Sequence, residues 1–443
     1  MRGETFYRNL FRLMNEHFIG MKFLAVVWEQ DQSLTRFANS RIHQNVAEKK
    51  ASLSVLVTKD NKLALATSND LTVSGLKSLR ERLEKMLEFA TPLDYNFKLP
   101  DVSVGYPVEN VAESLKKVFA EQRASIFDRM LRIAGEDVLL FGYVSDNVTE
   151  NVIMSSNGTF LYQSFGGVSF NVVAMCDSGS GYASGVAKSY EELNVDEKVE
   201  RAVRFAKMSK SPVEIDPGTY TVILGPEAVS DLFMYFAWLC TNGYTYELKL
   251  SPSVKYLGNK VGPDELNVYD DPTHPMQLPL MYDLCGKKRE KMPIIENGVF
   301  KNVFYSHGAA LRFNRKPTGH TLSLDDLDSS TPPNLVVAAG STPVEDMIKN
   351  TDRGIYVNRF HYMNIVDPQQ AMFTGMTRDG TFIVEKGQLT KAVKNMRFNV
   401  KFFDFTQNIE AISKEIESVA SEYFPQVAPY MKVKNFNFTS KTA

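Results

Sequence analysis

The sequence predicts an α+β fold, with helices packed on an antiparallel sheet in the first half and a sheet-dominated second half. Two observations carry this prediction. Most segments with helical apolar spacing precede residue 210. Short apolar runs flank the turn signals Asn157-Gly158, Asn297-Gly298 and Asp379-Gly380, and this arrangement is typical of antiparallel hairpins.

The expected elements of the first half follow from the spacing of apolar residues. Apolar side chains recur at helical spacing from Thr5 to Phe18, and strand-forming runs flank the turn Lys59-Asp60-Asn61. Strand, turn and strand follow one another from Glu136 to Val186. We expect helices at about 5–18, 73–89, 108–134 and 195–209, and strands at 23–28, 51–57, 62–67, 151–154 and 160–162.

A domain boundary is predicted at Lys210-Ser211-Pro212, because helical spacing stops there and a strand begins at Tyr220. The prediction is an N-terminal α+β domain at 1–210 and a C-terminal β-rich domain at 211–443. In the second domain, the polar segment from Pro317 to Asn334 is expected to form a long surface loop.

The composition is that of an ordinary globular protein, with 44% hydrophobic and 23% charged residues among 443. A net charge of -2 gives no electrostatic basis for binding nucleic acid or an anionic membrane. No window approaches the roughly 20 apolar residues of a membrane span, and the first residues lack a signal-peptide pattern. Cys176, Cys240 and Cys285 form no CxxC pair, so three reduced and mostly buried thiols of a cytoplasmic protein are expected.

The chain lacks the usual local signatures of catalytic sites. The glycine-rich run from Cys176 to Gly185 lacks the Gly-Lys-Ser/Thr end of a phosphate loop, and we expect it to connect two strands. No GxSxG motif occurs, and the acidic run at 324–328 lacks the spacing of a calcium loop. An HExxH zinc motif is excluded because no two histidines stand four residues apart among His17, His43, His274, His307, His320 and His361.

The most informative segment runs from Tyr220 to Cys240. A strand ends at Gly225, Pro226 suits the first position of a helix, and Glu227 favours the positive end of the helix dipole. The helix that follows is apolar nearly all round, which predicts burial on several sides.

This strand-proline-helix unit and the last hundred residues resemble the TldD/PmbA family, also called TldD/TldE and historically described as modulators of DNA gyrase. The resemblance covers essentially the whole chain and is most specific near the C-terminus. The segments similar to family motifs are Thr35–Ile42, Ala66–Leu71, Ile295–Asn302, Thr351–Val357, Ile365–Pro368, Phe373–Gly375, Ile383–Leu389 and Val393–Phe398.

The resemblance also implies that the chain lacks a zinc site of its own. In the catalytic TldD branch, this helix carries HExxxH, in which two histidines bind zinc and the glutamate is the general base. The matching positions here are Met234, Tyr235 and Leu239. The Met234 thioether is a poor zinc ligand, the Tyr235 phenol is a poor base at neutral pH, and Leu239 has only an alkyl side chain. That branch also uses a C-terminal cysteine, and no cysteine follows Cys285. The chain therefore resembles the non-catalytic TldE/PmbA branch, with zinc expected only in a catalytic partner subunit.

By the same resemblance, the chain would form a heterodimer with a TldD-like catalytic subunit, or a homodimer, around a cavity in which unfolded peptides are degraded or trimmed. Peptide would bind in extended form along a sheet edge. The expected channel residues are Tyr235, Trp238, Arg359 and His361, although each also suits plain packing or a surface role. Family members often carry glycines where this chain has 359–364, so bulkier side chains would narrow the groove.

Two other functions stay open. The first is an autonomous metallopeptidase or other hydrolase with an unrecognised metal or nucleophile, for which the histidines to examine are His274, His307, His320 and His361. The second is a regulator that binds nucleic acid or gyrase, which rests only on the family's older description. The near-neutral charge disfavours nucleic acid as a partner.

Overall fold

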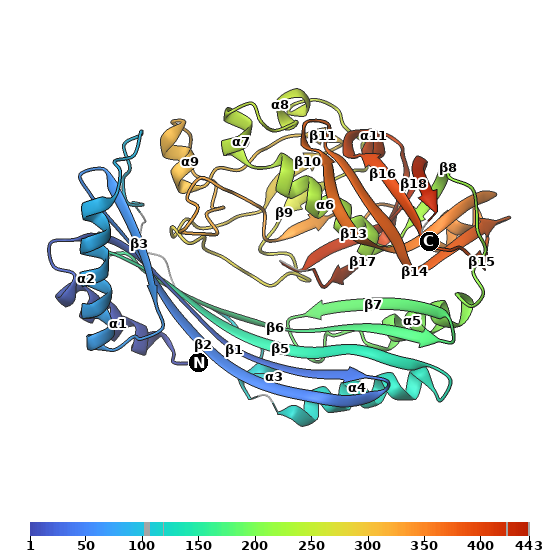
Figure 1. Ribbon diagram of the computed structural model, residues 1–443, viewed down its shortest axis with the longest axis horizontal. Coiled ribbons are helices and arrows are strands. Elements are labelled where there is room, and N and C mark those ends of the chain that lie inside the picture. Colours follow the sequence, from blue (N-terminus) through green and yellow to red (C-terminus); the bar gives the residue numbers. More distant parts are fainter. Residues whose placement is uncertain (102–106, 118, 422–423, 442–443) are drawn as a thin grey trace.

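The computed structural model describes residues 1–101, 107–117, 119–421 and 424–441. It contains two β-sheets with helices, which confirms the predicted α+β fold (Figure 1). The first sheet and its helices comprise α1 (Glu4–His17), β1 (Lys22–Ala38), β2 (Arg41–Lys59), β3 (Lys62–Ser68), α2 (Val73–Phe89), β4 (Val108–Asn110), α3 (Glu113–Lys116), α4 (Ala120–Ala134), β5 (Leu139–Ser155), β6 (Phe160–Cys176), β7 (Gly179–Ala187) and α5 (Asp196–Met208). The second group comprises β8 (Gly218–Leu224), α6 (Pro226–Cys240), α7 (Gly243–Glu247), α8 (Ser253–Tyr256), β9 (Val268–Asp270), β10 (Met292–Glu296), β11 (Val299–Phe300), α9 (His307–Arg312), β12 (Leu335–Val337), α10 (Val344–Lys349), β13 (Arg353–Asp367), η1 (Pro368–Gln370), β14 (Met372–Glu385), β15 (Gln388–Ala392), β16 (Met396–Lys401), α11 (Phe402–Gln407), β17 (Ile409–Val419) and β18 (Gln426–Lys441).

Helices cover one face of the first sheet, and the second group of elements lies on the other face. Its strand order is β3-β2-β1-β5-β6-β4, with β7 also paired to β6. Val27 of β1 packs in the cluster that holds α1 and α2, and Phe37 of the same strand packs in the cluster that holds α4 and α5. These two residues point to the same face because side chains alternate along a strand. On the other face, Leu24 and Val26 belong to one hydrophobic cluster with Tyr282 and Leu324 of the second group. Figure 1 shows the second group above the first sheet.

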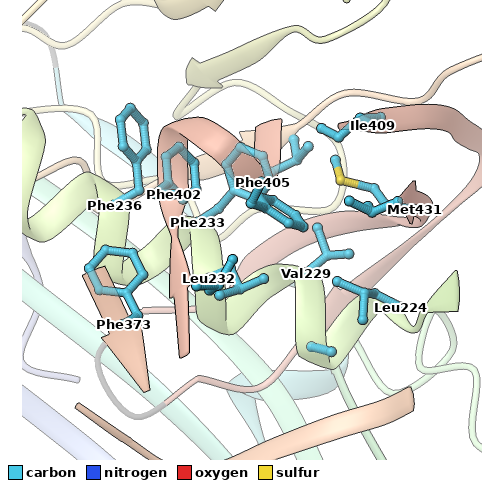
Figure 2. Packing of buried hydrophobic residues seen from close by; sticks show 14 of the residues in the cluster. Leu224, Val229, Leu232, Phe233, Phe236, Phe373, Phe402, Phe405, Ile409 and Met431 are labelled. Atoms are coloured by element: carbon cyan, nitrogen blue, oxygen red, sulfur yellow. The ribbon is translucent and has the colours of Figure 1, made fainter. Parts of the chain in front are cut away.

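Five strands of the second sheet close into a ring. β8 pairs with β13, β13 with β14, β14 with β16 and β16 with β18, and β18 returns to β8. The helix α6 packs against β13 and β18. Figure 2 shows Phe233 and Phe236 of α6 beside Phe402 and Phe405 of α11, and the rings of Phe236 and Phe402 are stacked with centroids 4.3 Å apart. The helix α6 is therefore held in place by its packing on β13, β18 and α11.

The predicted helix at 108–134 is wrong in its first half. Val108–Asn110 forms the strand β4, which pairs in parallel with residues 163–165 of β6. Phe119 then has an extended backbone, and its N–H donates to the Gln122 side chain at 2.9 Å as α4 begins. Pairing with a distant strand overrides the local helical spacing here. Val118, which the prediction also included, lies outside the described residues.

The predicted turn at Asp379-Gly380 is also wrong, because β14 runs through it. Val357 pairs with Thr381 and Arg359 with Arg378, so Asp379 and Gly380 together oppose the single residue Asn358. The φ values of 51° and 119° at these two residues are those of a β-bulge. The chain reverses later, at 386–387. The other two predicted turns do connect paired strands: Asn157-Gly158 lies between β5 and β6, and Asn297-Gly298 lies between β10 and β11.

The segment from Pro317 to Asn334 is irregular, as expected, but it is not a surface loop. His320, Thr321 and Leu324 are buried, and Leu324 packs against the first sheet. Contact with both sheets stabilises this segment without regular backbone pairing. The three cysteines are buried and free, as predicted. Among the described residues, no helix is long and apolar enough to cross a membrane.

Candidate functional site

The helix α6 begins where the two sheets meet. The N–H of Gly225 donates to the Val357 carbonyl at 2.8 Å, and Pro226 is the first helical residue, as predicted. A Cβ at position 225 would lie 2.8 Å from the Asn358 carbonyl oxygen, so glycine permits this close approach to β13. Glu227 accepts a hydrogen bond from the Ser184 N–H of β7 at 3.2 Å. The start of α6 is thus bound to both sheets.

Three side chains of α6 occupy the positions that the resemblance assigns to zinc ligands and base. The sulfur of Met234 accepts a hydrogen bond from the Ser421 hydroxyl at 3.3 Å. The hydroxyl of Tyr235 donates to the Met363 carbonyl at 2.7 Å. Leu239 is partly buried against the core of the second sheet. A thioether, an engaged phenol and an alkyl group do not form a zinc-binding set, so these residues do not fit the metal.

A cavity of about 340 Å³ lies beside these positions. Met234, Tyr235 and Trp238 line it from α6, residues of the 322–335 segment line it from another side, and Phe424 and Gln426 contribute at the start of β18. The side chain of Trp238 is 57% exposed. Two of the four expected channel residues, Tyr235 and Trp238, therefore meet in one cavity.

Arg359 and His361 lie on β13 and do not line this cavity. The Nε of Arg359 donates to Asp379 in the β14 bulge at 2.7 Å, and its guanidinium lies 4.0 Å from the ring centroid of Tyr182. His361 lines a second cavity of about 280 Å³ that also contains Ser180. Burial and neighbouring arginines lower the pKa of His361. Of the four predicted channel residues, Tyr235 and Trp238 thus line one cavity, His361 lines another, and Arg359 lines neither of the two.

Asp231 of α6 is a further candidate site residue that the sequence patterns did not predict. Glu227 precedes it by one turn and Tyr235 follows it by one turn, so the three lie on one helix face. Burial, opposed by Arg359 and aided by the Glu227 carboxylate, raises the pKa of Asp231 from 3.8 to about 7. No hydrogen bond from the described residues reaches the Asp231 carboxylate. Two acids at helical spacing in a nearly apolar helix were the signal that could have identified it.

We expect Asp231→Asn to remove a pH dependence of stability between pH 3.8 and about 7. Because the folded state holds this proton to a higher pH than the unfolded state does, the free energy of unfolding of the natural protein falls as pH rises through that window. Asparagine cannot ionise, so the variant gains stability relative to the natural protein as pH rises. Denaturant unfolding at several pH values measures this, and parallel pH profiles would contradict it.

A buried ion cluster joins α5 to the second sheet. Glu417 of β17 lies 2.9 Å from Lys198 Nζ and accepts a hydrogen bond from Arg201 at 2.9 Å. Both Arg201 and Glu417 bond the Tyr430 hydroxyl. Burial alone would raise the pKa of Glu417, but Lys198 and Arg201 outweigh burial and lower it. The cluster links the two sheets at a point where water is largely excluded.

The histidines considered as ligands do not gather in one place. His320 Nε2 lies 3.1 Å from Asp270 in the core, and His307 Nε2 lies 2.7 Å from the Lys98 carbonyl. His274 Nδ1 accepts a hydrogen bond from a backbone N–H within its own turn. Across the described ranges, His, Cys, Asp and Glu side chains form no group of three or more that could hold a metal.

Known proteins share the sequence features of this chain. Residues 113–210 match the profile of the PmbA/TldA metallopeptidase central domain, and residues 217–440 match that of the C-terminal domain. A metalloprotease of Synechocystis is 25% identical over 293 residues, which cover 61% of this chain and 60% of the relative. The metalloprotease PmbA of Escherichia coli O157:H7 is 22% identical over 244 residues, which cover 54% of this chain and 50% of the relative. The matches thus span only about half to three fifths of these relatives' length.

Solved structures share the fold over nearly the whole chain. TldE from Thermococcus kodakarensis superposes with a TM-score of 0.89 at 20% identity, covering 98% of this chain and 99% of that one. A Thermotoga maritima protein provisionally named a modulator of a DNA gyrase gives 0.85 at 21% identity, covering 98% and 100%. Because the C-terminal profile alone matches half of the residues, this chain belongs to the PmbA/TldD metallopeptidase family.

Proposed function

We propose that this chain is a non-catalytic, TldE/PmbA-like subunit of a cytoplasmic metallopeptidase complex that degrades or trims unfolded peptides. The proposal rests on the side chains that α6 carries at the positions of the zinc ligands and the general base. Tyr235, at the position of the general base, donates a hydrogen bond from its hydroxyl to the Met363 carbonyl, and Leu239, at a ligand position, packs against the core. These side chains hold the helix in place, and a TldD-like catalytic subunit would supply the zinc.

The contribution of this chain would be a wall for the bound peptide. Leu335 and Gln426, the first residues of β12 and β18, both line the cavity beside α6. An extended peptide in that cavity would meet the ends of two strands, and backbone hydrogen bonds to strands give affinity with little demand on sequence. Trp238 adds an exposed aromatic surface at the same place.

Exposed apolar side chains near the C-terminal end of α6 offer a surface for the catalytic subunit. Gln369 beyond the end of β13 donates to the Leu250 carbonyl at 3.2 Å, and Ser251 donates to the Leu239 carbonyl at the end of α6. These bonds bring three segments together. Large exposed apolar patches mark interaction sites, and the large apolar side chains exposed on and near these segments are Trp238, Leu248, Leu250, Val254, Tyr362 and Val366.

The proposal is tested by measuring metal content and cleavage of an unfolded polypeptide for three samples: this chain, its HExxxH-bearing relative, and the mixture. We expect no stoichiometric zinc and no cleavage by this chain alone, and a rise in activity on mixing. Metal-dependent cleavage by this chain alone would overturn the proposal in favour of an autonomous hydrolase. An absence of any effect on mixing would overturn the subunit role.

A matched pair of variants tests the proposed contact surface in the same assay. Leu250→Asp places a charge where an apolar contact is expected, and burying an unpaired charge is costly. We expect the rise in activity on mixing to fall at least about tenfold. Phe119→Asp is the control, because Phe119 is 61% exposed, close to the 56% of Leu250, but lies beside α4. Equal effects of the two variants would exclude this surface.

A further inference from the structure

The cavity beside α6 is small and is lined in large part by apolar side chains. Its volume of about 340 Å³ lies at the lower end of the range of small-ligand pockets. Met234, Trp238 and Phe424 line it, as do Pro332 and Pro333. Asp326 is the single charged residue among the described residues that line it. The walls therefore favour an apolar group and oppose an acidic one.

Gln426, at the start of β18, is a polar residue of this cavity. Gln426 is 4% exposed and lines the cavity, and no described residue forms a hydrogen bond with its amide. An amide carries both donors and an acceptor, so a ligand that offers a matching donor and acceptor would be favoured there.

Another glutamine of the same protein shows what such an amide can hold. The Gln163 side chain accepts hydrogen bonds from the N–H groups of Met281 and Tyr282 at 2.9 and 3.1 Å. It also donates to the Tyr282 carbonyl at 3.0 Å. A buried glutamine thus fixes an irregular segment through its backbone alone, and Gln426 has the same groups to offer.

We infer that this cavity is a specificity pocket for one bulky apolar side chain, aromatic or long aliphatic, of an extended peptide. The amide of Gln426 hydrogen-bonds the peptide backbone beside that side chain, and Trp238 covers the side chain from α6. The inference rests on the proposed function for the class of ligand, because it takes an unfolded peptide as the substrate. The pocket itself consists of residues of this chain and needs no partner subunit.

The test uses the fluorescence of Trp238 in the full chain. The sequence contains two tryptophans, so Trp28→Phe leaves Trp238 as the only reporter. The probe is a hexapeptide of glycine and serine, blocked at both ends, with phenylalanine at one central position, and its control carries aspartate there. We expect a saturable blue shift with the phenylalanine peptide, because its ring would remove water from Trp238. The aspartate peptide should give no shift over the same concentrations.

Three variants distinguish peptide binding in the pocket from nonspecific binding elsewhere on the protein. Ser329→Phe fills the cavity from its exposed rim and should abolish the shift, whereas Ser178→Phe in the exposed β6–β7 turn should leave it unchanged. Gln426→Leu keeps a similar size and removes the amide, so affinity should fall about threefold to tenfold. Circular dichroism spectra confirm that each variant is folded.

The inference is overturned if the phenylalanine peptide gives no shift, if both peptides shift Trp238 equally, or if Ser329→Phe binds as well as the unaltered pocket. These outcomes do not depend on the catalytic subunit. If the phenylalanine peptide binds while mixing with the HExxxH relative yields no activity, the subunit proposal fails and the pocket stands.

Discussion

Replacing Asp270 with asparagine is expected to lower the free energy of unfolding by about 3 to 5 kcal/mol, as for buried ion pairs that lose one partner. Asp270, Arg289 and His320 are almost completely buried. Asp270 accepts hydrogen bonds from the Arg289 guanidinium and, at 2.9 Å, from the Asn334 N–H, and lies 3.1 Å from His320 Nε2. Asparagine would leave the Arg289 cation without a counter-charge in the core.

The pKa of Asp270 gives the pH range of this contribution. Burial opposes its ionisation, but Arg289 and the hydrogen bond from His320 outweigh burial and lower the pKa from 3.8 to about 2. Because the folded state releases the proton more readily than the unfolded state, the stabilisation is complete above pH 3.8 and is lost as pH falls toward 2. Asp270→Asn should therefore be most destabilising near neutral pH.

Denaturant unfolding followed by circular dichroism measures the loss. Asp264→Asn is the matched control, because Asp264 also pairs with a cation, Lys260, but both side chains are well exposed. Exposed pairs contribute about 0 to 1 kcal/mol, so this variant should unfold nearly as the natural protein does. Similar losses for the two variants would show that burial of the Asp270 pair does not decide its effect.

Glu417→Gln is expected to cost about 3 kcal/mol or more, because two largely buried cations lose their shared counter-charge. Lys198 and Arg201 come from α5, which packs on the first sheet, whereas Glu417 belongs to β17 of the second. The substitution should therefore weaken the coupling between the two sheets as well as total stability.

The two tryptophans report on the two sheets separately, since Trp28 lies on β1 and Trp238 on α6. Measured in Trp238→Phe and Trp28→Phe backgrounds, the denaturation midpoints should coincide in the natural sequence and separate after Glu417→Gln. Glu84→Gln is the control, because Glu84 pairs with Arg80 on the partly exposed surface of α2. Coincident midpoints in Glu417→Gln would contradict the coupling role.

The sequence allowed prediction of those elements whose signals lie within the element itself. The helix α2 runs from Val73 to Phe89, as predicted, with the Thr72 side chain capping its first turn at 3.3 Å from the Gly75 N–H. Pro226 begins α6 as expected. The helix predicted at 108–110 was wrong because this segment pairs with a strand about 50 residues further along the chain. No local sequence pattern indicates such a pairing.

The candidate site was likewise predictable only in part. The family resemblance located Met234, Tyr235 and Leu239, but Tyr235 and its partner Met363 are 128 positions apart. Arg201 and Glu417 are 216 positions apart. Asp379 suggested a turn because its residue type favours one, yet the bulge turns its carboxylate toward Arg359. Such contacts depend on how distant strands align, which residue type and spacing alone do not specify.

The ring of strands in the second sheet has a consequence for synthesis in the cell. Leu224 of β8 pairs with Met431 of β18, so the two edges that meet there leave the ribosome about 200 residues apart. Until β18 emerges, α6 lacks one of the strands on which it packs, and chains with such exposed apolar surface are prone to aggregate. The second sheet therefore completes its folding only after most of the chain has been translated. Chaperones that hold nascent chains should affect the yield of this half more than that of the first.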